Sequence, residues 1–216
     1  EISQIAARHG RTVKVLRLGG PKFNLLSSTL PAAALANALV AVYSLPGQNS
    51  HDEPEWLKSC VYRIFLHALG ILRLAYGEVT LKDLALLLSG PLRADPSPDD
   101  PNAIPEELSQ ELERCRRAFL NSPEADRLEE FDYHAHFFER QFVRMNPKNK
   151  ATLTDAALDL VEPFAAPDLA ETFCAQGGEI DSIGTLMEKG EIVVFAPDER
   201  LGRAAITAAI LLKLDF

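Results

Sequence analysis

Apolar residues recur along most of the chain at helical spacing, and β-like patterns occur only near its two ends. The clearest helical stripe consists of Leu57, Cys60, Val61, Ile64, Ala68, Leu72 and Ala75. Repeats of three and four residues are typical of one face of an α-helix, and Gly77 is a suitable residue to end this helix. The same reasoning predicts further helices over residues 30–43, 80–88, 106–120, 124–145, 152–164, 167–174, 181–188 and 200–212.

Two short segments have the pattern of β-strands. Residues 13–18 alternate apolar and basic side chains and end at Gly19-Gly20-Pro21, which predicts a strand followed by a turn. Residues 192–196 are apolar and mostly β-branched, which favours a buried strand. Roughly 170 residues separate the two strands, whereas a crossover between parallel strands needs only about a dozen.

We therefore expect a mainly α fold with an inserted helical domain. The predicted all-α domain covers residues 51–175, between a flanking α/β segment at 1–50 and a returning helix–strand–helix segment at 176–216. Five prolines within residues 90–105 predict an exposed excursion, because proline at that density is incompatible with helix or sheet.

Composition narrows the class of protein. The 216 residues are 47% hydrophobic and 25% charged, which is typical of a globular domain and excludes a disordered or collagen-like chain. Cys60, Cys115 and Cys174 are few and widely spaced, so we expect free thiols in a reducing compartment. The longest apolar stretch falls short of the roughly 20 residues that a membrane span needs.

Charge is distributed unevenly along the chain. The net charge is −9, made up of +4 for residues 1–50 and −13 for the remainder. An overall acidic balance argues against a protein that coats nucleic acid, which usually presents a basic surface.

Three motifs resemble phosphate-binding, catalytic or metal-binding sites. For each of them the sequence favours a purely structural role. The turn Gly19-Gly20-Pro21-Lys22 follows a strand, but it lacks the GxxxxGK[ST] pattern of a phosphate-binding loop. Asp198 and Glu199 follow the second strand as catalytic acids do in motor ATPases, yet they also suit the start of a helix. His134 and His136 lie two positions apart in a helix, so they face opposite sides and do not share a metal ion.

Basic residues form two kinds of candidate contact. Arg11, Lys14 and Arg17 have no acid near them in sequence and are predicted to contact phosphate or a neighbouring subunit. A substrate-docking surface is predicted at Arg114, Arg116, Arg117, Arg140 and Arg144. Acids lie close to this second set, so solvated helix faces are the alternative interpretation.

The order of these elements resembles the TraG/TraD-type coupling proteins of type IV secretion and conjugation, which are relatives of the HerA/FtsK hexameric motors. In that family a strand leads into an asparagine-proline-leucine turn, and here residues 13–18 lead into Phe23-Asn24-Leu25-Leu26 without the proline. An Ala-rich helix, a tryptophan-bearing helix and a returning helix–helix–strand run follow in the family's order. They correspond to residues 31–43, 56–76 and 152–195, and residues 201–212 correspond to the helix before the family's catalytic-acid strand.

The resemblance implies that the chain is the central segment of a longer ATPase. The phosphate-binding loop would precede residue 1 and the catalytic-acid strand would follow residue 216, so no catalytic activity and no cofactor are expected in this segment. The parent would bind ATP and Mg²⁺, form a homohexamer and move DNA or protein through its channel.

The resemblance also implies where the segment acts and what it binds. Its helical domain would receive relaxosome components or effector proteins at the cytoplasmic mouth of a bacterial inner-membrane complex, without contacting the membrane. Two alternatives stay open: a HerA/FtsK-like DNA-translocating motor outside secretion, and a stand-alone helical domain that binds other proteins.

Overall fold

Helix α3 (Glu55–Tyr76) forms the centre of the molecule. Twelve of its 22 residues are buried, including Phe65, Leu69 and Leu72. The sequence predicted a stripe along one face, but burial extends almost around the helix because α2, α5, α6 and α7 all pack against it. A helix that is apolar on nearly all sides belongs in the middle of a core.

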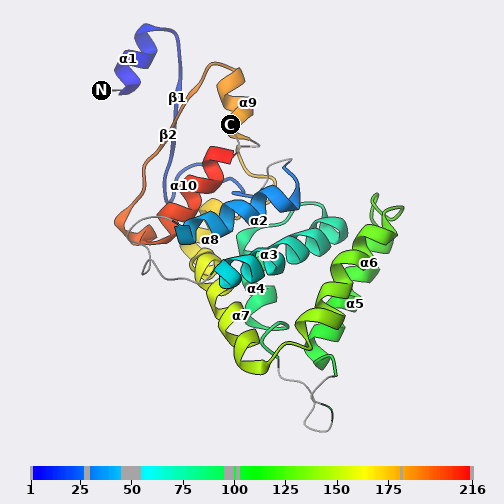
Figure 1. The fold of residues 1–216 in the computed structure, drawn as a ribbon. Coiled ribbons are helices and arrows are strands. Elements are labelled where there is room, and N and C mark those ends of the chain that lie inside the picture. Colours follow the sequence, from blue (N-terminus) through cyan, green and yellow to red (C-terminus); the bar gives the residue numbers. More distant parts are fainter. Residues whose placement is uncertain are drawn as a thin grey trace.

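The computed structural model describes residues 2–26, 30–44, 55–94, 100, 103–180 and 182–214. The described chain is mainly helical with one small sheet (Figure 1). Besides α3, the helices are α1 (Ile2–Arg8), α2 (Ala32–Ala41), α4 (Leu81–Ser89), α5 (Glu106–Leu120), α6 (Leu128–His136), α7 (Pro147–Val161), α8 (Pro167–Phe173), α9 (Ile183–Glu188) and α10 (Ala204–Leu214). Short 3₁₀ turns follow at Val42–Ser44, Glu162–Ala165 and Glu199–Leu201.

The two predicted strands pair in parallel, each slightly shorter than predicted. Strand β1 (Val13–Leu16) lies beside β2 (Ile192–Phe195), with Val13 opposite Ile192 and Leu16 opposite Phe195. Figure 1 shows this pair projecting from the helical body, with α1 and α9 at its far end. Most of the helices thus lie, in sequence, between two strands that are neighbours in space.

Local sequence signals explain several helix boundaries. Thr80 accepts a hydrogen bond from the backbone N–H of Asp83, and the Asp83 carboxylate accepts one from the Thr80 N–H, which fixes the start of α4. Gly77 ends α3 with a φ of 74°, a left-handed conformation that glycine adopts at little cost.

Three predicted boundaries are wrong. Residues 124–127 form a turn that Ser122 anchors by accepting from the Glu124 N–H, so α6 begins only at Leu128. Asn146 caps α7 instead of only breaking the preceding helix, so α7 begins at Pro147 and not at 152. Asp198 caps a 3₁₀ turn, and α10 begins after it, at Ala204.

The predicted 124–145 helix also changes its winding. Residues Phe137–Phe142 form a π-helix, which widens the turn by one residue. As a result Phe137, Phe138 and Phe142 are all buried. The α-helical stripe that continues from Phe131 and His134 includes only Phe138 and Phe142 of these three.

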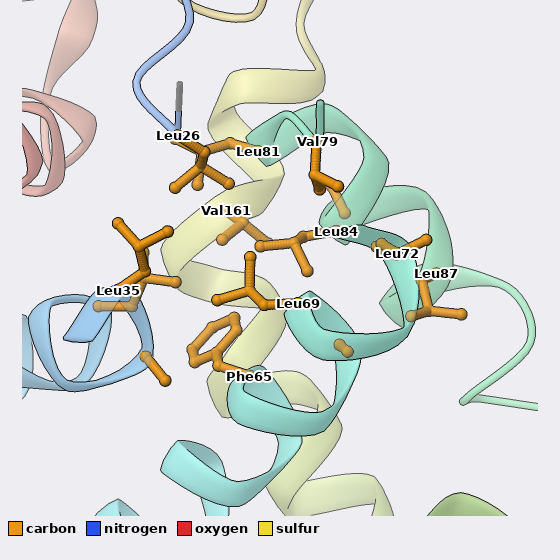
Figure 2. Packing of buried hydrophobic residues seen from close by; sticks show 14 of the residues in the cluster. Leu26, Leu35, Phe65, Leu69, Leu72, Val79, Leu81, Leu84, Leu87 and Val161 are labelled. Atoms are coloured by element: carbon orange, nitrogen blue, oxygen red, sulfur yellow. The ribbon is translucent and has the colours of Figure 1, made fainter. Parts of the chain in front are cut away.

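One hydrophobic core runs through the described chain. It extends from Leu16 beside the sheet, through α3, to Leu212 in α10. Figure 2 shows its central part, where Phe65, Leu69 and Leu72 of α3 meet Leu84 of α4, Val161 of α7 and neighbouring apolar residues.

Some predictions concern residues that the structure does not describe. These include the loop at 47–53, Asp181, and residues 95–99, 101 and 102 of the proline-rich segment. Within the described part, no single helix is long and apolar enough to cross a membrane; α3 and α4 meet that test only together, as a pair bent by 115°.

Candidate functional site

The β1–β2 pair leaves both of its outer edges open within the described chain. The Ile192 N–H donates to the Thr12 carbonyl at 2.8 Å, and the Ala196 N–H donates to the Leu16 carbonyl at 2.9 Å. Because backbone groups alternate in direction along a strand, those of Val13 and Val15 point away from β2, and those of Val193 and Phe195 point away from β1. Each edge can therefore accept another strand.

The faces of this small sheet are also incompletely covered. Val15 is 37% exposed, and all four residues of β2 are half-buried. Parallel sheets are normally covered on both faces and contain more than two strands. The described sheet is therefore smaller and less covered than a typical parallel sheet.

The structure spreads the predicted basic contact along the β1 edge. Arg11, Lys14 and Arg17 are exposed, and none forms an ion pair among the described residues. From Arg11 to Arg17 an extended chain covers about 20 Å. The three side chains are therefore spread along this segment and do not form a compact phosphate site.

The predicted docking arginines of α5 are already engaged. Arg114 pairs with Glu111 at 2.7 Å and Arg117 with Glu113 at 3.8 Å. Arg116 pairs with Asp132 of α6 at 2.7 Å and lies over the Phe131 ring, 5.2 Å from its centroid.

Arg140 and Arg144 lie in and just after the π-helix. Both are exposed and without an ion pair in the described part of the chain. They therefore retain a free positive charge, unlike the three arginines of α5.

A surface groove runs between α4 and α5, which the sequence reasoning missed. Two adjoining hollows of about 980 and 820 Å³ share Pro91, Glu111 and Arg114 in their lining. Leu86 of α4 and Tyr76 at the end of α3 are 57% and 46% exposed and line the second hollow. Leu86 lies within an almost continuous apolar run, so its exposure had no signal in the sequence.

A buried pair of histidines joins α3 to α6. The Nδ1 atoms of His67 and His134 lie 3.1 Å apart, so one ring donates a hydrogen bond to the other. The His67 ring stacks on Phe137 of the π-helix at a centroid distance of 4.2 Å, and the Arg63 guanidinium covers the same phenyl ring. His134 packs directly against Gly70.

Burial keeps both imidazoles neutral. Burial, together with smaller effects of the neighbouring His134 and Arg63, lowers the pKa of His67 to about 4. Burial also lowers the pKa of His134. A hollow of about 470 Å³ lies beside the pair, lined by Tyr62, His136 and other residues.

His134 and His136 of α6 differ in their surroundings. His136 is exposed while His134 is buried, which confirms that the two residues face opposite sides. Among the described residues no group of three or more histidine, cysteine or acidic side chains could hold a metal ion.

The other two sequence motifs have structural partners. The Gly19 N–H donates to Thr172 Oγ1 at 3.1 Å, and Lys22 Nζ pairs with Glu171 at 2.8 Å, so this turn is attached to α8. Asp198 accepts hydrogen bonds from the side chain and backbone N–H of Arg200, which lower its pKa to about 2.

No family model, curated protein or solved structure matches this chain.

Proposed function

We propose that this chain is the substrate-recognition segment of a coupling-protein-like secretion ATPase. The helical body would be inserted between two strands of the motor's parallel sheet. The single observation that supports this is the β1–β2 pair, whose two strands are neighbours in space, lie at opposite ends of the sequence and have open outer edges. In this proposal the ATP, the Mg²⁺ and the hexameric ring belong to the parent, whose RecA-like sheet supplies the missing strands.

The charge distribution supports protein recognition by the helical body. Residues after position 50 carry a net charge of −13. An acidic surface repels the phosphate backbone of nucleic acid and attracts proteins that present basic residues. The basic residues Arg11, Lys14 and Arg17 lie instead in β1 and beside its two ends, where they would face a neighbouring subunit.

The first test is the reading frame that contains this segment. We expect a GxxxxGK[ST] loop upstream, and an apolar strand ending in Asp-Glu downstream. A frame that encodes only these 216 residues would contradict the proposal and favour a stand-alone protein-binding domain. Secretion genes beside the frame would separate the coupling-protein proposal from a DNA-translocating motor outside secretion.

The second test is hydrogen exchange at the open edges. In the isolated chain, the outward amides of Val15 and Val193 should exchange fast, because they lack a partner strand. In the longer parent protein, the outward amides on whichever edge gains a partner strand should become protected from exchange. The inward amide of Val194 is the internal control, because it faces β1 in both proteins. Unchanged fast exchange at both edges in the parent would show that the sheet has only two strands.

A further inference from the structure

We propose that the groove between α4 and α5 binds an amphipathic helix of a partner protein, with lysine or arginine residues beside its apolar stripe. This inference rests on the proposed function, because it identifies the surface and the chemistry by which the helical body would recognise a protein. It assigns the docking surface to the acids and apolar residues of the groove. Arg114 and Arg117 also line the groove, but both are paired with acids of α5.

The floor of the groove is apolar and partly exposed. Leu72 and Val79 form its base, and Leu86 and Tyr76 project beside them. Leu86 is the most exposed of these apolar side chains, with 57% of its surface accessible. A partner that covers Leu86 removes this apolar surface from water, which is the main source of binding energy in such grooves.

The walls of the groove carry an excess of negative charge. Its lining contains five acids and three arginines. Arg114 and Arg117 are paired with acids of the same helix, and Arg93 is paired with Asp155. Of the remaining acids, Glu78 and Glu107 form no ion pair among the described residues, and the Asp83 carboxylate accepts hydrogen bonds from Thr80 in the α4 cap. Lysine or arginine residues on the partner would therefore complete these ion pairs.

The dimensions of the groove match a short helix. Its wall on α5 extends from Glu107 to Ala118. The eleven residue steps between them rise about 16 Å along the helix axis, which is the length of three helical turns. An occupant of three turns presents apolar residues at positions i, i+3, i+4 and i+7 to one face. Basic residues at the flanking positions would then face Glu78 and Glu107.

Two synthetic peptides test the proposal on the intact chain. Both are helical 14-residue peptides with the same leucine stripe; one carries lysine and the other glutamate at the flanking positions. We expect the lysine peptide to bind, as measured by fluorescence anisotropy, and to weaken as salt rises. The glutamate peptide should bind at least tenfold more weakly. Equal binding of the two peptides, or no binding of either, would overturn the proposal.

Matched substitutions locate the site. Leu86→Ala should weaken lysine-peptide binding by about tenfold, because it removes the exposed anchor. Leu120→Ala is its control, since Leu120 is similarly exposed, at 55%, but lies outside both hollows. Glu107→Lys should weaken binding severalfold. Glu106→Lys is the control, because Glu106 shares the first turn of α5 but does not line the groove.

Sedimentation of the chain alone tests a second copy as the occupant. Self-association that Leu86→Ala abolishes would show that the groove binds another molecule of this chain, and would overturn the proposal of a separate partner. If the groove binds neither peptide, the expected hydrogen exchange at the sheet edges is still unchanged. The two proposals can therefore fail independently.

Discussion

Helix propensity and core packing predict opposite effects on stability when Gly70 is replaced by alanine. Gly70 lies in the middle of α3 and is buried. Alanine is the better helix former by about 1 kcal/mol, so helix propensity alone predicts that Gly70→Ala stabilises the protein. In the structure, a Cβ atom at this position would lie 2.4–2.5 Å from three atoms of the His134 ring. Contacts this short are not tolerated, so the ring must move.

The expected net effect is a loss of stability. Overpacking a core typically costs about 1–3 kcal/mol. Movement of the His134 ring also breaks its hydrogen bond with His67, and an unsatisfied buried polar group costs about 1–3 kcal/mol. After subtracting the gain in helix propensity, Gly70→Ala should lower the free energy of unfolding by about 1–5 kcal/mol.

Urea unfolding followed by far-UV circular dichroism measures this change. Each kcal/mol should also lower Tm by roughly 2–4 °C for a domain of this size. The control is the same substitution in a His134→Ala background, where the clash is gone and Gly70→Ala should become neutral or stabilising. A rise in stability in the wild-type background would refute the packing of His134 on Gly70.

Three further predictions follow from the described contacts. The free energy of unfolding should fall by about 2 kcal/mol from pH 7 to pH 5. The reason is that His67 stays neutral in the folded chain, whereas in the unfolded chain it takes up a proton below pH 6.5. Urea unfolding across this pH range measures the fall. Thr80→Ala should lower the free energy of unfolding by about 1 kcal/mol through loss of the α4 cap, also measured in urea. Cys115 should react slowly with alkylating reagents at pH 8, because burial raises its pKa to about 12; mass spectrometry of the modified protein reports the rate.

Each of these predictions has a control. His67→Phe should flatten the pH dependence, whereas substitution of the exposed His9 should leave it in place. Ser89→Ala at the other end of α4 should change stability much less than Thr80→Ala. Cys115 should react rapidly once the chain is unfolded in urea; equally rapid alkylation of the folded protein would contradict its burial.

Local sequence signals predicted the elements that depend on local interactions. The start of a helix near Thr80, the end of α3 at Gly77 and the two strands all follow from neighbouring residues. The π-helix did not, because Phe131, His134, Phe138 and Phe142 have spacings that an ordinary α-helix also satisfies. In the wider turn, Phe137 stacks on His67, a residue of α3 that is far away in sequence.

The candidate sites depend on contacts that the sequence does not encode locally. His67 and His134 are 67 residues apart, and their pairing requires the relative placement of α3 and α6. The groove depends on the gap between α4 and α5, so the exposure of Leu86 could not be distinguished from the burial of Leu87 and Leu88. The sequence predicted the α5 arginines as a docking surface. Their ion pairs with Glu111 and Glu113 depend on how the side chains lie on the helix, which only the structure shows.

The pairing of β1 with β2 has a consequence for the order of folding. Each residue pair in this ladder joins positions about 180 residues apart in the chain, so its contact order is very high. Closing so long a loop in an unfolded chain costs about 5 kcal/mol in entropy before any constant term. A ladder of four residue pairs does not offset that loss on its own. The helical body must therefore assemble first and bring the strands together, and the strand pair is the last part to form and the first to separate.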